Sequence, residues 1–279
     1  MTTQNDINNR IREIQCKSIL NRSRIESIDY TINPYTGCLH GCVYCYARFM
    51  TRYTNHSMPW GCFCDVKLNA PDILQKQIVK AKKGLVSLST VTDPYQALEK
   101  KYAITRRILH ILSDHQFPVS VLTKSGLVVR DIDLLKRFDR EDCEVGFSMA
   151  TLDENIRRHF EPHAPPVSER IQALRRLHEE GIHTWVFLAP VLPYLTKQSL
   201  AELLNEIKES VDSLLVDTLN IKCGNWHTIS GVLRKAYPAQ MKNWKTVFSS
   251  NETKRKYYQD LFEIIAELCD MYRLDVQFC

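Results

Sequence analysis

An alternation of short apolar runs with segments of helical periodicity limits the fold more than any other feature of the chain. The apolar, β-rich runs are Leu85–Ser89, Val119–Thr123, Glu144–Met149, Thr184–Ala189 and Leu214–Ile221. The helical patterns beside them are Asp72–Lys83, Leu98–His115, Asp131–Phe138, Ser168–Glu180 and Ser199–Val211. Nearly continuous apolar strands joined by helices predict a parallel sheet whose outer face is covered by those helices.

A further strand near Ser27–Ile32 makes six strand–helix units. We therefore expect an α/β fold, a partial (β/α)6 barrel with its functional residues at the carboxyl ends of the strands. The barrel would span residues 27–221, between an N-terminal extension (1–26) and a helical C-terminal extension (222–279). A doubly wound sheet is the alternative. No Gly-x-Gly-x-x-Gly or Walker-type loop follows a strand, which argues against nucleotide folds of those kinds.

Composition adds an expectation about the cellular compartment. The chain has 279 residues, 44% of them hydrophobic, which is enough to bury a substantial core. The N-terminus does not read as a signal peptide, and the apolar stretch at 185–192 is too short to span a bilayer. We therefore expect a cytoplasmic protein that is not associated with a membrane and whose ten cysteines are reduced.

Three cysteines lie together in a segment without apolar periodicity, residues 33–47. Cys38, Cys42 and Cys45 are separated by three and two residues, and Gly37 and Gly41 between them suit a tight turn. Thiolates suit iron–sulfur clusters, and a fully ligated [4Fe–4S] electron carrier needs four of them. Three thiolates would leave one iron open to bind a substrate or cofactor. A zinc site completed by Cys62, Cys64 or His40 is the alternative.

The C-x3-C-x2-C pattern, with Tyr44 directly before its last cysteine, resembles the radical S-adenosylmethionine (radical SAM) superfamily. The resemblance implies a [4Fe–4S] cluster held by Cys38, Cys42 and Cys45, with S-adenosylmethionine chelated at the open iron. Reductive cleavage of the sulfonium bond would then give a 5′-deoxyadenosyl radical that abstracts a hydrogen atom from the substrate. Reduced flavodoxin or ferredoxin is the implied electron donor.

Longer phrases resemble the spore photoproduct lyase-related branch of that superfamily. They are Thr90–Gln96, Thr105–Arg106, Thr123–Ser125, Arg130–Leu135 and Glu161–Pro165 with Arg170. The resemblance implies cofactor contacts by Tyr44, Thr92, Lys124, Ser148 and the backbone of Ala189. Helix caps and a surface lysine are the alternative roles for such strand-end residues. Glu161 and Arg170 are expected to be structural ties, in a salt bridge or a cap.

One residue differs from its counterpart in the lyase. Thr90 stands where the lyase has the cysteine that returns a hydrogen atom to the repaired thymine. A threonine O–H bond is too strong for that role, so repair by the lyase's route is not expected. Cys223, after the last predicted strand, is the candidate donor, and a buried core thiol is its alternative role.

Charge is concentrated in the C-terminal extension. The chain carries a formal net charge of +5, and the stretch from Lys222 to Lys256 holds eight basic residues against the single acid Glu252. Trp226, Tyr237, Trp244 and Phe248 are interleaved with these cations. The pattern suits single-stranded or lesion-bearing nucleic acid, or another phosphate-bearing molecule. A solvated helical cap whose aromatic residues pack on the barrel is the alternative.

Two classes of function follow from these features. One is an enzyme that generates the deoxyadenosyl radical and acts on an unidentified substrate. The other is a non-catalytic iron–sulfur or zinc module that binds nucleic acid through its basic segment. Lys124 and Ser148 at cofactor-binding positions favour the enzyme, because a binding module needs neither.

Overall fold

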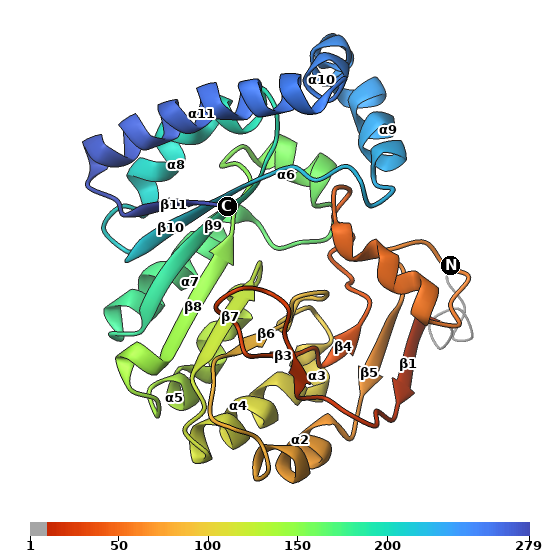
Figure 1. Ribbon diagram of the computed structural model, residues 1–279, viewed down its shortest axis with the longest axis vertical. Coiled ribbons are helices and arrows are strands. Elements are labelled where there is room, and N and C mark those ends of the chain that lie inside the picture. The colour runs from red at the N-terminus through yellow and green to blue at the C-terminus, as the bar shows by residue number, and fades with distance from the viewer. Residues whose placement is uncertain (1–9) are drawn as a thin grey trace.

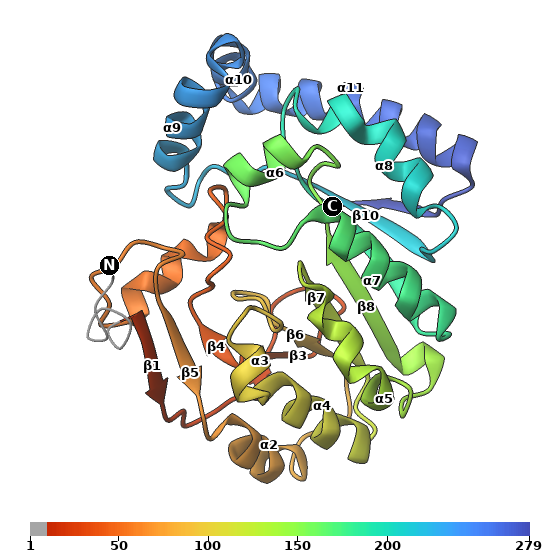
Figure 2. The same cartoon turned by 180° about the vertical axis from the view of Figure 1, so that it is seen from behind.

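The computed structural model describes residues 10–279, so the first nine residues of the predicted N-terminal extension lie outside it. An eight-stranded sheet curves through the molecule, with helices packed on its outer face (Figures 1 and 2). Its central strands are β3 (Tyr30–Ile32), β6 (Val86–Leu88), β7 (Val119–Thr123), β8 (Cys143–Ser148), β9 (His183–Val191) and β10 (Ser213–Thr218).

These six strands pair in chain order, and every pair is parallel. The sequential order confirms the partial barrel and excludes a doubly wound sheet, whose strand order reverses at a switch point. The sheet ends at β2 (Asn21–Arg22), antiparallel to β3, and at β11 (Val276–Phe278), parallel to β10. Within residues 10–279 these two edge strands do not pair with each other, so the barrel is open.

The outer helices follow the predicted order, with one exception. They are α2 (Ala70–Ile78), α4 (Ile104–Asp114), α5 (Ile132–Leu135), α7 (Val167–Glu179), α8 (Leu200–Ile207) and α11 (Asn251–Tyr272). The single helix predicted over Leu98–His115 is wrong, because α3 (Glu99–Tyr102) ends at Ala103, whose φ is 48°. The Glu99 carboxylate accepts the backbone N–H groups of Thr105 and Arg106 and so begins α4 as a separate helix.

Ion pairs with buried carboxylates explain two of the sequence motifs, Thr105–Arg106 and Arg130–Leu135. Arg130 lies 2.8 Å from the Glu99 carboxylate, and Arg106 lies 2.9 Å from Asp131. Glu99 and Asp131 are fully buried, and Tyr95 donates its hydroxyl to Asp131. These contacts join α3 and α4 to the segment after β7, so Thr105–Arg106 and Arg130–Leu135 stabilise the barrel wall.

A second, three-stranded sheet was not predicted. It contains β1 (Ile11–Ile14), β5 (Cys64–Lys67) and β4 (Tyr35–Thr36), in the order β1–β5–β4. These strands are short, and β1 and β5 carry charged residues, so the sheet lacks the apolar signal of the barrel strands. The strand β4 leads directly into the cysteine segment, which positions that segment beside the barrel (Figure 1).

The C-terminal extension packs on the barrel through its aromatic residues. It consists of α9 (Trp226–Ala236), α10 (Met241–Val247), α11 and β11. Trp244 is fully buried and stacks on Phe160 of α6 (Glu154–Phe160), with ring centroids 6.1 Å apart. Tyr237 also packs on Phe160. Of the two roles expected for these aromatic residues, Trp244 has the packing role, and its buried ring is not available to stack on a base.

The remaining short elements are 3₁₀ helices. They are η1 (Tyr46–Tyr53), η2 (Gly126–Asp131), η3 (Arg140–Asp142), η4 (Thr196–Ser199) and η5 (Pro238–Gln240). Among residues 10–279, none of the helices combines the length and the apolar character needed to cross a bilayer.

Candidate active site

The three clustered cysteines lie in the loop between β4 and η1, hereafter the cluster loop (residues 37–45). Cys38 and Cys42 are buried, and Cys45 is half-buried. Residues that follow β6 hold the loop in place: Thr92 donates its hydroxyl to the Gly37 carbonyl at 2.5 Å. The start of this loop therefore lies against the carboxyl end of a central strand, where the functional residues were predicted to lie.

Glycine is required at Gly37 and Gly41. Their φ angles are +93° and +61°, in the left-handed region that side chains disfavour. A Cβ atom at Gly37 would lie 2.6 Å from the carbonyl oxygen of Phe63. Gly41 packs against Gly61, where an added Cβ would lie 2.6 Å from the Gly41 Cα. The cluster loop is therefore folded tightly against the segment that precedes β5.

The thiols of the cluster loop form a donor set suited to a cationic group. Burial raises the pKa of Cys38, and the nearby Asp93, Cys42 and Cys45 raise it further. Burial likewise raises the pKa of Cys42 and of Cys45. The thiols are therefore protonated when nothing is bound, and metal binding must displace their protons. Once deprotonated, the three thiolates would repel one another, and the positive irons of an iron–sulfur cluster would offset that repulsion. The residues therefore fit such a cluster.

The arrangement favours a cluster over a single zinc ion. Within residues 10–279, no three His, Cys, Asp or Glu side chains converge as one metal ion requires. A zinc ion draws all its ligands to about 2.0–2.3 Å, whereas the thiolates of a cube bind different irons. The Cys64 thiol lies 3.8 Å from the Gly37 carbonyl oxygen, and His40 faces Asp93 at 3.4 Å. Both side chains thus have partners of their own.

Three of the predicted cofactor contacts lie together at neighbouring strand ends. Lys124, which follows β7, donates from Nζ to Ser148 Oγ at the end of β8, at 2.5 Å. Ser148 Oγ in turn donates to the Ala189 carbonyl in β9, at 3.0 Å. The Lys124 ammonium also lies 5.8 Å from the centre of the Tyr44 ring. The parallel register of β7, β8 and β9 thus places these groups beside the cluster loop.

A buried carboxylate, Glu161, joins the cluster loop to this lysine. It accepts the Tyr44 hydroxyl, lies 3.6 Å from Lys124 Nζ and pairs with Arg170 at 2.5 Å. Burial raises the pKa of Glu161, but the charges of Arg170 and Lys124 outweigh it and hold the pKa at about 2. The predicted salt bridge between Glu161 and Arg170 is confirmed. No local signal in the sequence showed that Tyr44 and Lys124 share the same carboxylate.

Thr92 lies apart from that group. Its hydroxyl donates to the Gly37 carbonyl and accepts a hydrogen bond from Gln96 Nε2 at 3.1 Å. Gln96 also accepts the backbone N–H of Leu39 at 3.0 Å. The structure thus places Thr92 and Gln96 as ties that hold the cluster loop, and the sequence did not identify Gln96.

The loop after β10 and the first turn of α9 also contact the cluster loop. Asn225 donates to the Tyr44 carbonyl at 2.6 Å, and Thr228 donates to the Val43 carbonyl at 2.9 Å. Cys223, in the same loop, is half-buried and near enough to Cys45 to add to the rise in its pKa that burial causes. It is therefore not a core thiol. No sequence pattern marked Asn225 or Thr228, because their partners are backbone atoms far away in the chain.

Thr90 lies beside the end of the cluster loop. Its carbonyl accepts the hydroxyl of Tyr46, which directly follows Cys45, and its side-chain oxygen accepts from Asn33 at 3.4 Å. Thr90, the residue that the sequence resemblance matches to the lyase's donor cysteine, is therefore next to the cluster loop.

We expect Glu161→Gln to lower the free energy of unfolding of the metal-free protein by about 3–5 kcal/mol at pH 7, because it leaves two buried cations without their carboxylate. Glu206→Gln, which removes an exposed partner of Arg175, should cost less than about 1 kcal/mol. Urea unfolding measures both.

The same carboxylate predicts an acid dependence. Its pKa is about 2 in the folded protein against 4.5 ordinarily, so its stabilisation is present above about pH 4.5 and is lost as the pH falls toward about 2. The free energy of unfolding of the Glu161→Gln variant should therefore lack that part of the decrease at low pH. Equal urea midpoints for the Glu161 and Glu206 variants would contradict this interpretation.

Comparisons with known proteins agree with this geometry. A family model described as the Radical SAM superfamily matches residues 32–207. An uncharacterized protein of Methanocaldococcus jannaschii is 34% identical over 250 residues, which cover 90% of each chain. A relative from Pseudomonas phage M6, named a radical SAM Nalpha-GlyT isomerase, is 23% identical over 82% of this chain and 45% of its own length.

A solved structure shows the same fold. A spore photoproduct lyase mutant with bound AdoMet and dinucleoside spore photoproduct superposes with a TM-score of 0.70 and 14% identity, over 96% of this chain and 80% of the lyase chain. The family model covers more than half of the present chain, and its match includes the whole cluster loop. The protein therefore belongs to the radical SAM superfamily, whose enzymes use a [4Fe–4S] cluster to cleave S-adenosylmethionine.

Proposed function

We propose that Cys38, Cys42 and Cys45 hold the [4Fe–4S] cluster and that S-adenosylmethionine binds next to it, against Lys124, Ser148 and the Ala189 carbonyl. The observation that supports this most is the buried Glu161, which contacts both Tyr44 of the cluster loop and Lys124. One carboxylate thus connects the expected metal ligands with the expected cofactor contacts.

The bound cluster and cofactor supply the reductive cleavage that yields a 5′-deoxyadenosyl radical. The chain's own residues bind the cofactor and orient it. Lys124 and Ser148 present a cation and a hydroxyl to a polar ligand, and both side chains are shielded from solvent. Because Glu161 and Arg170 are buried, the lysine is held in place by a rigid ion-pair network. A protein electron donor of the flavodoxin or ferredoxin type completes this proposal.

A phosphate-bearing substrate, nucleic acid in particular, is supported by the C-terminal extension. Its cations Lys222, Arg234, Lys235, Lys242, Lys245, Arg255 and Lys256 are exposed. Asn225 and Thr228 attach the start of this extension to the cluster loop. The basic segment therefore begins at the active site. The lyase whose fold matches was solved with a dinucleoside photoproduct, which agrees with a substrate of this class.

We further propose Cys223 as the residue that returns a hydrogen atom to the substrate. It lies close to Cys45, in a loop rather than in the core. A thiol S–H bond is weak enough for this transfer, whereas the hydroxyl of Thr90 is not. Thr90 thus supports a reaction other than the repair of spore photoproduct by the lyase's route.

The test of the proposed activity is product analysis after anaerobic reconstitution with iron and sulfide. With dithionite and S-adenosylmethionine we expect 5′-deoxyadenosine from the wild-type protein and none from Cys45→Ala, because that variant lacks one ligand of the cluster. Offered dinucleoside spore photoproduct, the protein should release little or no repaired thymine dinucleotide. Absence of 5′-deoxyadenosine from protein that contains its full complement of iron would contradict the proposed activity, and rapid repair would contradict the inference from Thr90.

Lys124→Ala and Ser148→Ala should weaken S-adenosylmethionine binding while the iron content stays at the wild-type level. Each lost contact is expected to cost about 1–3 kcal/mol of binding free energy, because its partner is left unsatisfied. Equilibrium binding of the cofactor to the reconstituted, unreduced protein gives the affinities. Lys136→Ala is the matched control, since Lys136 is half-exposed and pairs with Glu180 on the outer surface. Wild-type affinity in both test variants would assign Lys124 and Ser148 a purely structural role.

A further inference from the structure

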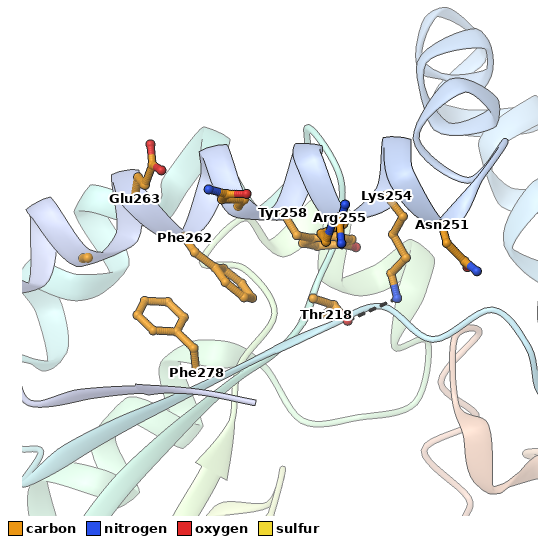
Figure 3. A pocket seen from close by; sticks show the side chains of 10 residues that line it. Thr218, Asn251, Lys254, Arg255, Tyr258, Phe262, Glu263 and Phe278 are labelled. Carbon is orange, nitrogen blue, oxygen red and sulfur yellow. Dashed lines mark hydrogen bonds between the residues drawn. The ribbon is translucent and has the colours of Figure 1, made fainter.

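A groove lies between α11 and the strands β10 and β11, outside the site described above. Its volume is about 540 Å³, which is in the range of ligand-binding pockets. Figure 3 shows Thr218 and Phe278 on the strand side, facing Lys254, Tyr258 and Phe262 of α11. The groove therefore combines hydroxyl and cationic groups with a row of aromatic rings.

The cations gather at one end of the groove. Lys254 donates from Nζ to Thr218 Oγ1 at 3.3 Å and lies 5.6 Å from the centre of the Tyr258 ring. Arg255 follows it on the first turns of α11 and is exposed. In the part of the chain that the structure describes, neither Lys254 nor Arg255 forms an ion pair within 4 Å, and the carboxylate that acts on Lys254 from farther away is that of Asp217. This end of the groove is suited to an anion.

Aromatic rings line the rest of the groove. Phe262 and Phe278 pack against each other with ring centroids 4.6 Å apart, yet Phe278 remains 40% exposed. Part of the Phe278 ring is thus open to solvent at the end of the groove opposite Lys254. Glu263 lines the groove on the aromatic side, so a second phosphate is not favoured there. The groove fits one phosphate and one stacked ring.

The cationic end is the end nearer to the active site. Thr218 is the last residue of β10, and the carboxyl ends of the barrel strands face the cluster loop. The chain that continues from Thr218 reaches the cluster loop, where Asn225 donates to the Tyr44 carbonyl at 2.6 Å. A chain molecule that leaves the active site along β10 would therefore meet Lys254 and Arg255 first and Phe278 next.

We propose that this groove binds single-stranded nucleic acid next to the nucleotide that reacts, with a backbone phosphate at Lys254 and Arg255 and a base stacked on Phe278. The inference rests on the proposed function, since it extends the same substrate away from the radical site. Unpaired cations provide affinity for the phosphate, and the ring provides stacking that tolerates any base.

The test is fluorescence anisotropy with a labelled single-stranded thymidine oligonucleotide, added to the reconstituted protein with S-adenosylmethionine and without reductant. The wild-type protein should bind with an affinity that falls as salt rises. Arg255→Ala should reduce the slope of log affinity against log salt by about one, because one phosphate contact is lost. Phe278→Leu keeps the apolar packing on Phe262 but should weaken binding by about tenfold with the slope unchanged.

Lys136→Ala is the control, because Lys136 is an exposed lysine outside the C-terminal extension, pairs with Glu180 and does not line the groove. The affinity of this control variant for the oligonucleotide should fall by far less than that of either groove variant. Wild-type affinity and salt slope in Arg255→Ala and Phe278→Leu would overturn the proposal, as would a wild-type protein that does not bind the oligonucleotide. Formation of 5′-deoxyadenosine by the wild-type protein without oligonucleotide is a separate measurement, so the failure of the groove and the failure of the radical chemistry are distinguishable.

Discussion

The ion pair between Glu161 and Arg170 is the interaction on which the candidate active site depends. Both side chains are buried, and transferring two charges out of water is costly unless their other polar groups are paired; of these groups, only the Arg170 Nε lacks a partner. Here the remaining bonds go to functional elements: Glu161 binds Tyr44 and approaches Lys124, while Arg170 donates to the Ser148 carbonyl at 2.9 Å. A hydrophobic pair would stabilise the core equally well. The charged pair in addition fixes the cluster loop relative to the ends of β7 and β8.

The open sheet gives this site its access. Because β2 and β11 are edge strands, the barrel is not closed by the strands themselves, and the C-terminal extension covers one side of it. That extension has two surfaces with different roles. Its buried rings, Trp244 above all, fasten it to α6, whereas its exposed cations and the groove under α11 remain available to a partner. The same segment thus serves as the structural cap and as the proposed substrate surface.

The barrel could be predicted because its strands are apolar runs: β6, β7 and β8 are buried almost throughout, and buried residues alternate with half-buried ones in β9. The predicted and observed limits of β7 coincide at Val119–Thr123, and all six strands appear in the predicted order. Features that depend on distant partners could not be predicted. The break between α3 and α4 depends on the Glu99 carboxylate, and the three-stranded sheet consists of short strands without an apolar pattern. The grouping of Lys124 with Ser148 followed from strand order, but the contact between Tyr44 and Glu161 joins residues 117 positions apart.

The most direct test of the central claim, that the three cysteines hold a cluster with one open iron, is the EPR spectrum of the reduced, reconstituted protein with and without S-adenosylmethionine. We predict one [4Fe–4S] cluster per chain, lost in Cys38→Ala, Cys42→Ala and Cys45→Ala, and a spectrum that changes when the cofactor is added because the cofactor binds the open iron. Zinc in place of iron in anaerobically prepared protein, or a spectrum indifferent to the cofactor, would contradict this claim.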